Sequence, residues 1–92
     1  MKHAGTETFA LLASVLVRLR AIPGLVERTP GAFYFRSKAF LHFHADPTGV
    51  FADVKLDFTS FERLSVRTSA EQTQLLKLVM SSLAAANKVK SK

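Results

Sequence analysis

Residues 39–55, AFLHFHADPTGVFADVK, decide the fold of this chain. Apolar and polar side chains alternate on both sides of a central Asp-Pro-Thr-Gly turn, which is typical of two antiparallel β-strands joined as a hairpin. The proline sets φ at the second turn position, the Asp46 carboxylate can cap the turn, and Gly49 accepts a left-handed backbone. The pattern therefore predicts strands over 39–45 and 50–58.

Two registers of the hairpin are compatible with this turn. A loop of the Pro-Thr pair alone places His42 opposite Asp53, whereas a bulge at Gly49 shifts the pairing by one residue and reverses the faces. We favour the first register because the second would bury two histidines against the valines. In the favoured register one apolar face is formed by Leu41, Phe43, Ala45, Val50, Ala52 and Val54.

Weaker strand signals flank the hairpin. Residues 25–28 and the aromatic run 32–36 are predicted to be strands, separated by a turn at 29–31. A second tight turn is expected at 37–38, and 61–66 is a candidate fifth strand at the edge of the sheet. The centre of the chain therefore predicts an antiparallel sheet of four or five strands.

Amphipathic helices are predicted on both sides of the strand region. Residues 6–20 repeat apolar side chains every three or four positions, with Thr6 as the N-cap. Thr68-Ser-Ala-Glu71 is a capping box, and it opens a helix that we expect to end by Asn87. The apolar stripe of this second helix consists of Leu75, Leu76, Val79, Met80 and Leu83.

These elements predict an α+β fold in which an N-terminal and a C-terminal helix pack on one face of the antiparallel sheet, in the order α-β-β-β-β-(β)-α. We expect residues 1–87 to form a single domain and residues 88–92 to form a basic, disordered tail. A chain of 92 residues has room for one core, which excludes a two-domain enzyme.

Composition and charge narrow the function classes. The chain has no cysteine, which excludes disulfides, thiolate catalysis and Cys-ligated zinc. The apolar run 9–17 is too short to span a bilayer, and arginines follow it where a signal peptide has small residues, so we expect a cytoplasmic protein. The formal net charge is +6, and residues 72–92 hold four lysines and no acid. Lys88, Lys90 and Lys92 are therefore candidates for nonspecific contact with nucleic acid.

One candidate site is found on the hairpin, although no catalytic signature accompanies it, because the glycines lie in separate turns and the acids are scattered. Strand alternation places His42 and His44 on one face, with Asp53 opposite His42. Imidazole and carboxylate groups suit zinc or iron, so these residues are candidate metal ligands or a small-anion site. The simpler interpretation is a solvent-exposed polar face held by one His–Asp pair.

Aromatic residues give a second candidate surface. Tyr34, Phe40 and Phe51 fall on the strand faces opposite the core, where they would form an exposed apolar patch. Because two helices cover one side of a sheet, we expect this patch to support a homodimer or a ligand groove, with Tyr34 and Phe40 as binding residues. The core is expected to hold Phe33, Phe35, Phe43 and Phe58.

A family resemblance covers roughly residues 20–58. It is carried by Ile22-Pro-Gly-Leu-Val-Glu-Arg28, Ala32-Phe-Tyr-Phe-Arg36, Lys38 and His42-Phe-His44. These short motifs resemble a small family of luciferase-domain proteins of unknown function, and the helix-plus-sheet layout is similar to the YjbR-type fold. The resemblance implies an α+β fold, adds weight to His42 and His44, and implies no substrate.

Taken together, the sequence favours a non-enzymatic α+β binding or interaction module, with no cofactor and no catalytic residues. A nucleic-acid-binding accessory domain that uses the basic C-terminal end is one alternative. A small metal-binding protein that uses the histidine strand is the other.

Overall fold

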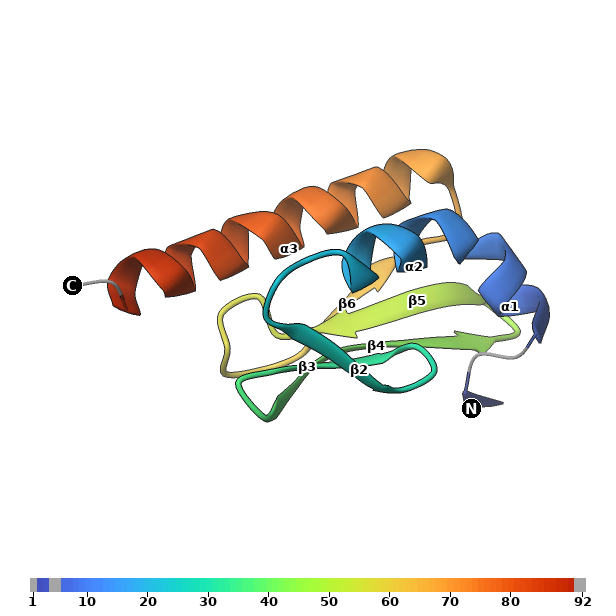
Figure 1. Ribbon diagram of the computed structural model, residues 1–92. Helices are drawn as coiled ribbons and strands as arrows, with labels where there is room; N and C mark the ends of the chain where they lie inside the picture. The colour runs from blue at the N-terminus through green and yellow to red at the C-terminus, as the bar shows by residue number, and fades with distance from the viewer. Residues whose placement is uncertain (1, 4–5, 91–92) are drawn as a thin grey trace.

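An antiparallel sheet in the strand order β2-β3-β4-β5-β6 forms one layer of the computed structural model (Figure 1). A two-residue strand, β1 (Lys2–His3), pairs with β4 outside this order. The structure describes the backbone of residues 2–3 and 6–90 and the side chains of residues 9–86. The strands of the main sheet are β2 (Leu25–Thr29), β3 (Ala32–Phe35), β4 (Lys38–Asp46), β5 (Gly49–Val54) and β6 (Glu62–Ser65).

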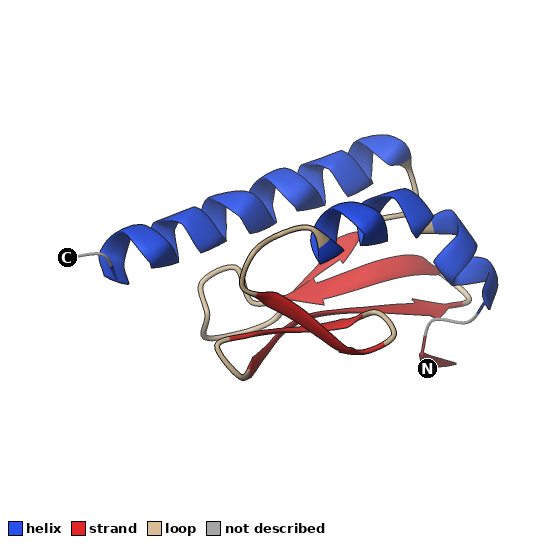
Figure 2. Ribbon diagram, in the orientation of Figure 1, coloured by secondary structure: helices blue, strands red, loops and turns tan. Residues whose placement is uncertain are grey.

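The three helices in the described part of the chain form the second layer, and they lie on the same face of the sheet (Figure 2). The single helix predicted at the N-terminal side is divided into α1 (Thr6–Leu11) and α2 (Ala13–Arg20), because the backbone of Leu12 departs from helical values (φ −93°, ψ 3°). The third helix, α3 (Ser69–Lys90), continues past the predicted end at Asn87. The predicted α+β class is therefore confirmed.

The opposite face of the sheet is here called the open face, because none of the described helices covers it (Figure 2). No helix in the described part of the chain is both long enough and apolar enough to cross a bilayer. The side chain of Thr6 lies outside the described residues, and so does the N-cap predicted for it.

The central hairpin adopts the favoured register. β4 and β5 pair so that only Pro47 and Thr48 lie between the strands, and His42 lies opposite Asp53. The backbone N–H of Thr48 donates a hydrogen bond to Oδ1 of Asp46 over 2.8 Å, as the turn sequence predicts. Strand alternation and turn chemistry are therefore sufficient to place this hairpin.

The core lies between the inner face of the sheet and the helices. Leu41 and Val54 face each other across the hairpin and are 1% and 0% exposed. Met80 is a correction to the predicted stripe of α3, since it is 58% exposed and lines a groove between α2 and α3. The helices contribute Leu12, Val15, Leu16, Leu19, Leu75, Leu76, Val79 and Leu83 to the core.

Phe40 departs from its predicted face because β4 bulges at this residue. Phe33 pairs with Leu41. Tyr34 pairs with Ala39, which leaves Phe40 without a partner on β3. The bulge turns Phe40 into the core beside Leu41, and both side chains are buried. The expectation of an exposed Phe40 is therefore wrong, since simple alternation fails where a strand contains an extra residue.

Phe58 also differs from its prediction. The strand expected over 50–58 ends at Val54, and the backbone N–H of Phe58 donates to the carbonyl of Lys55 in a turn. Phe58 is 40% exposed, so it lies at the margin of the core. Phe33, Phe35 and Phe43 are buried as predicted.

The predicted capping box begins α3. Oγ1 of Thr68 accepts the N–H of Glu71 over 3.2 Å, and Oε1 of Glu71 accepts the N–H of Thr68 over 3.2 Å. The backbone hydrogen bond from Thr68 is the largest cause that holds the pKa of Glu71 below its ordinary value. The local signal therefore fixes where the helix starts.

Candidate functional site

The predicted histidines and Asp53 come together on the open face, and a fourth residue joins them. Nε2 of His42 and Nε2 of His44 lie 3.3 Å and 3.1 Å from the same carboxylate oxygen, Oδ2 of Asp53. Nε of Arg63, on the neighbouring strand β6, donates to Oδ1 of Asp53 over 3.1 Å. These four residues are here called the histidine cluster. Arg63 was missed because its pairing with Asp53 depends on how the edge strand docks.

His44 is buried, which corrects the expectation of a solvent-exposed polar row. His44 is 3% exposed, whereas the side chain of His42 is 40% exposed. The Phe51 ring lies 5.8 Å from the His44 ring, and β1 pairs along this part of β4. Neither ring nitrogen of His44 makes a well-aligned hydrogen bond within the described structure, although Nε2 is close to Asp53. The contact between them is therefore mainly electrostatic.

Asp53 is the shared acceptor of the histidine cluster. Partial burial raises the pKa of this carboxyl, but the side-chain contacts from Arg63 and His44 outweigh the burial, and the pKa of Asp53 lies below its ordinary value. The carboxylate is therefore ionised at neutral pH and holds the two imidazoles and the guanidinium around it.

The histidine cluster has the geometry of an ion-pair network. In the part of the chain that the structure describes, no group of three or more His, Cys, Asp or Glu side chains is placed to hold a metal ion. Both imidazoles converge on a carboxylate that Arg63 already occupies, and Asp46 is used by its own turn. The metal interpretation of His42, His44 and Asp53 therefore gains no support from the geometry.

Aromatic rings extend the cluster into a row across the open face. The Phe61 ring meets the edge of the His42 ring at a centroid distance of 5.3 Å. The rings of His42 and His44 are 5.9 Å apart, and those of His44 and Phe51 are 5.8 Å apart. We call these four rings, Phe61, His42, His44 and Phe51, the aromatic row.

Cations lie against both ends of the aromatic row. Nζ of Lys55 is 4.8 Å from the centroid of the Phe61 ring. The guanidinium carbon of Arg63 is 5.6 Å from the centroid of the Phe51 ring. Tyr34, a predicted binding residue, also faces the open side of the sheet and carries Arg28 at 4.9 Å from its ring. The open face therefore combines ring surfaces with positive charge.

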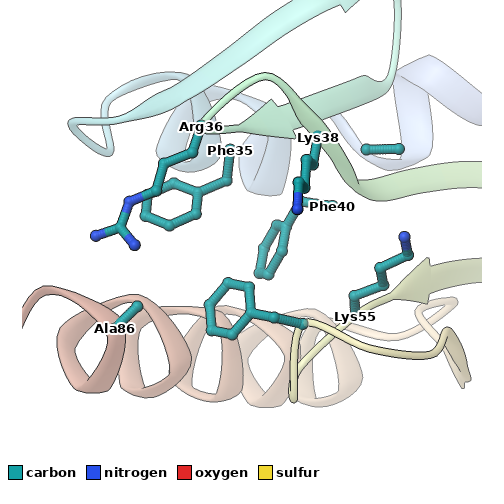
Figure 3. Close-up of a pocket in the computed structure, with 8 residues that line it drawn as sticks. Phe35, Arg36, Lys38, Phe40, Lys55 and Ala86 are labelled. Atoms are coloured by element: carbon teal, nitrogen blue, oxygen red, sulfur yellow. The ribbon is translucent and has the colours of Figure 1, made fainter. Parts of the chain in front are cut away.

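A pocket lies at the end of the sheet, between the β3–β4 turn, the loop after β5 and α3 (Figure 3). Its volume is about 330 Å³. Figure 3 shows the rings of Phe35 and Phe40 in its middle, with Arg36 on one side and Lys38 and Lys55 on the other. We call it the phenylalanine pocket; its lining is Phe35, Arg36, Lys38, Ala39, Phe40, Lys55, Phe58 and Ala86.

Three phenylalanine rings pack on one another in this pocket. The Phe40 and Phe58 rings are stacked with centroids 5.6 Å apart, and Phe35 lies 5.8 Å from Phe58 and 6.3 Å from Phe40. Phe40, predicted as a binding residue on the exposed face, therefore contributes to a pocket on the other side of the sheet. Phe58 was assigned to the core, and no local signal distinguishes that role from this one.

Backbone strain is concentrated around the same pocket. Arg36, Ser37 and Phe58 have φ values of 54°, 69° and 63°, and they are the non-glycine residues with positive φ in the described structure. This turn lies at Arg36 and Ser37, one residue earlier than predicted. It needs a left-handed backbone, which an Asn-Gly pair usually supplies in such hairpin turns. Left-handed conformations cost about 1–2 kcal/mol in ordinary residues and gather at functional sites.

The charged side chains that line the phenylalanine pocket are all positive among the described residues. Arg36, Lys38 and Lys55 line it, and no Asp or Glu side chain does so among the described residues. The guanidinium carbon of Arg36 also lies 4.7 Å from the Phe35 ring centroid. Aromatic faces with surrounding cations suit a ligand that is flat, apolar and negatively charged. The side chains of Lys88, Lys90 and Lys92, predicted to contact nucleic acid, lie outside the described residues.

Comparisons of the chain with protein-family models, with curated proteins and with solved structures find no match. The luciferase-domain and YjbR-type resemblances therefore stay predictions, and the site is interpreted from its own geometry.

Proposed function

We propose that this protein is a non-enzymatic binding module that takes a small aromatic anion in the phenylalanine pocket. The observation that carries this proposal is the lining itself, in which three packed phenylalanine rings are bordered by Arg36, Lys38 and Lys55 without an acidic side chain among the described residues. The aromatic ring of the ligand then contacts the phenylalanine rings, and its anionic group contacts the cations beside them.

The ring spacings support an aromatic ligand. Aromatic pairs are favourable at centroid distances of about 4.5–7 Å, and the three phenylalanine pairs lie within that range. A flat ligand can join such a cluster by the same offset or tilted contacts. The Lys38 and Lys55 ammonium groups then bind its charged group, since charge-assisted hydrogen bonds are stronger than neutral ones.

The volume supports a small ligand. Pockets for small molecules range from about 300 to 1,000 Å³, and the phenylalanine pocket, at about 330 Å³, lies at the lower end. One ring or two fused rings with one anionic group match this size.

The chemistry of the lining supports binding rather than catalysis. General acid–base catalysis uses imidazoles and carboxylates most often, and a lysine acts as base or nucleophile chiefly where an apolar pocket desolvates it. Lys38 of this lining is exposed. The residues that line the phenylalanine pocket are phenylalanine, alanine, arginine and lysine. They position a ligand without an evident proton acceptor beside it.

Calorimetry with 2-naphthyl phosphate tests the proposal, because two simpler compounds separate its parts. Inorganic phosphate carries the charge without the rings, and 2-naphthol carries the rings without the charge. We expect the phosphate ester to bind more tightly than both. Equal affinity for inorganic phosphate and the ester would contradict an aromatic pocket.

Matched variants locate the binding. Lys38→Gln removes a cation of the phenylalanine pocket, and we expect at least about tenfold weaker binding of 2-naphthyl phosphate, the equivalent of one charged hydrogen bond. Lys77→Gln removes the same charge from a separate groove between α2 and α3, and we expect unchanged affinity. Equal losses in the two variants would assign the binding to net charge and reject the pocket.

A further inference from the structure

Lys55 joins two surfaces that the proposed function treats separately. It lines the phenylalanine pocket, and its Nζ also lies 4.8 Å from the centroid of the Phe61 ring at the start of the aromatic row. A ligand larger than one aromatic anion can therefore leave the pocket past Lys55 and continue over Phe61 towards His42, whose neighbour Asp53 is already paired with Arg63.

The aromatic row has accessible rings next to this exit. Phe61 is 43% exposed, and the side chain of His42 beside it is 40% exposed. His42 lies opposite Asp53 on the central hairpin, and the Phe61 ring packs against it. No described helix covers the open face of the sheet (Figure 2). Phe51 lies further along the row, with Arg63 against its ring. The surface thus repeats the chemistry of the pocket, ring faces beside cations, along a path across the sheet.

We propose that the protein binds single-stranded nucleic acid, with one base in the phenylalanine pocket and the following bases over Phe61 and His42. This proposal rests on the proposed function, because it identifies the aromatic anion as one nucleotide of a strand. Proteins that bind single strands combine a positively charged path for the backbone with aromatic side chains on which bases stack. Lys38 and Lys55 supply charge at the pocket, and the net charge of +6 supplies the long-range attraction.

Charge favours a strand over a second copy of the chain on the same face. An isologous dimer would set the Arg28, Lys55 and Arg63 cations of one copy against the same set on the other. A polyanion is attracted by these cations, and the Asp53 carboxylate within the row is already paired with Arg63. The homodimer expected from the sequence thus becomes the competing occupant in the test.

The decisive experiment compares two probes on one variant. The strand probes are labelled dT and rU oligonucleotides of about six nucleotides, within the length that small single-strand binding surfaces cover. The second probe is 2-naphthyl phosphate, which reports on the pocket alone. We expect Phe61→Ala to weaken strand binding by about fivefold to a hundredfold, the usual effect of losing one stacked base, and to leave naphthyl phosphate affinity unchanged.

Three controls keep the result interpretable. Met80→Ala removes an exposed apolar side chain from the helix layer and should change neither affinity. Phe61→Leu keeps the apolar volume without the ring, so a loss in this variant excludes a folding defect as the cause. Lys55→Gln should weaken the binding of both probes. It should also reduce the slope of strand affinity against salt concentration by the amount expected for about one phosphate contact.

The outcomes separate the two proposals. Unchanged strand affinity in both Phe61 variants overturns the inference while the pocket stands on its own probe. Equal binding of an abasic strand overturns it as well, because base stacking would then contribute nothing.

Other results assign the binding to one surface. If strand binding depends on Phe61 but the protein does not bind naphthyl phosphate, the open face is supported as the binding surface and the pocket is rejected. Light scattering that shows a dimer broken by Phe61→Ala, with strand affinity intact, assigns the face to a second copy. The dT and rU arms show whether DNA or RNA is preferred.

Discussion

Two of the tight hairpin turns in the described sheet, β3–β4 and β4–β5, are built in different ways. The β4–β5 turn uses Pro47 and Thr48 without positive φ, and Asp46 caps it through its carboxylate. The β3–β4 turn uses Arg36 and Ser37, both with left-handed backbone. The second turn places positive φ at Arg36, which lines the phenylalanine pocket. The buried hairpin core around Leu41 and Val54 is here called the scaffold, and Arg36 and Phe58 are the strained residues of the pocket.

The largest expected effect on stability lies in the scaffold. Leu41→Ala removes a side chain that is 1% exposed between β5 and the helices, and we expect it to lower the free energy of unfolding by about 2–5 kcal/mol. Urea unfolding measures this loss. A small domain has a total free energy of unfolding of about 5–15 kcal/mol, so this substitution would remove a large part of it.

Phe58→Ala is the matched change in the strained region. Because Phe58 is 40% exposed, we expect a smaller loss of stability than for Leu41→Ala. We also expect weaker binding of 2-naphthyl phosphate, because the ring stacks on Phe40 in the pocket. If Phe58→Ala destabilises the protein more than Leu41→Ala and leaves binding intact, the division between scaffold and binding segment is wrong.

The next effect concerns the histidine cluster. Asp53→Asn keeps the shape of the side chain but removes the charge that His42, His44 and Arg63 share, and we expect a loss of about 1–3 kcal/mol at pH 7. The loss arises because a neutral amide, with one oxygen replaced by an NH2 donor, takes the place of the charged carboxylate that pairs with Arg63. Urea unfolding of the variant beside the wild type measures it.

The pH dependence of this loss follows from the lowered pKa of Asp53. A carboxyl whose pKa is lower in the folded state stabilises the fold above its unfolded value of 3.8, and this contribution disappears as the pH falls through the folded value. The stability gap between wild type and Asp53→Asn should therefore be full at pH 7 and narrow below about pH 4. A gap that widens in acid would show that Asp53 is not held ionised by its neighbours.

The sequence predicts the scaffold well because its signals are local. Alternation around Leu41 and Val54, together with the turn at Pro47, fixes the register and places His42 opposite Asp53. The capping box at Thr68 likewise fixes the start of α3 through contacts within four residues. Each of these features depends on neighbours in the chain, so the pattern alone is enough.

The candidate sites are harder to predict because they depend on distant residues. The bulge at Phe40 interrupts alternation without a glycine to mark it, and Phe58 adopts a left-handed backbone that its residue type disfavours. The burial of His44 depends on the contacts that Phe51 and β1 make beside it. Sequence patterns identify His42, His44 and Asp53 of the histidine cluster but not Arg63, and tertiary packing decides their exposure and assembles the phenylalanine pocket.

A smaller effect compares the two turns directly. Ser37 has a φ of 69°, which glycine adopts without the steric cost of a Cβ. We expect Ser37→Gly to raise the free energy of unfolding by about 0.5–1 kcal/mol, since relief of about 1–2 kcal/mol is partly offset by the greater flexibility of the unfolded chain. Thr48→Gly in the other turn should lower stability, because Thr48 has no positive φ and its Oγ1 hydroxyl, which glycine lacks, donates to Oδ1 of Asp46. Thermal unfolding of both variants gives the two signs, and equal signs would mean that the turns do not differ in strain.

The smallest effect concerns the loop that carries Phe58. Oδ1 of Asp57 accepts the backbone N–H of Thr59 over 3.0 Å and that of Ser60 over 3.1 Å. These hydrogen bonds favour the charged carboxylate and lower the pKa of Asp57 to about 2. Because the folded pKa is lowered, the contribution of these bonds to stability is present above the unfolded value of 3.8 and is lost only as the pH falls towards about 2. An NMR titration of the Asp57 carboxyl carbon should therefore show a midpoint near 2, with Asp57→Ala as the assignment control. A midpoint close to 3.8 would mean that the carboxylate does not hold this loop, and that the strained backbone of Phe58 is held by its hydrogen bond to the Lys55 carbonyl and by the packing of its ring on Phe35 and Phe40.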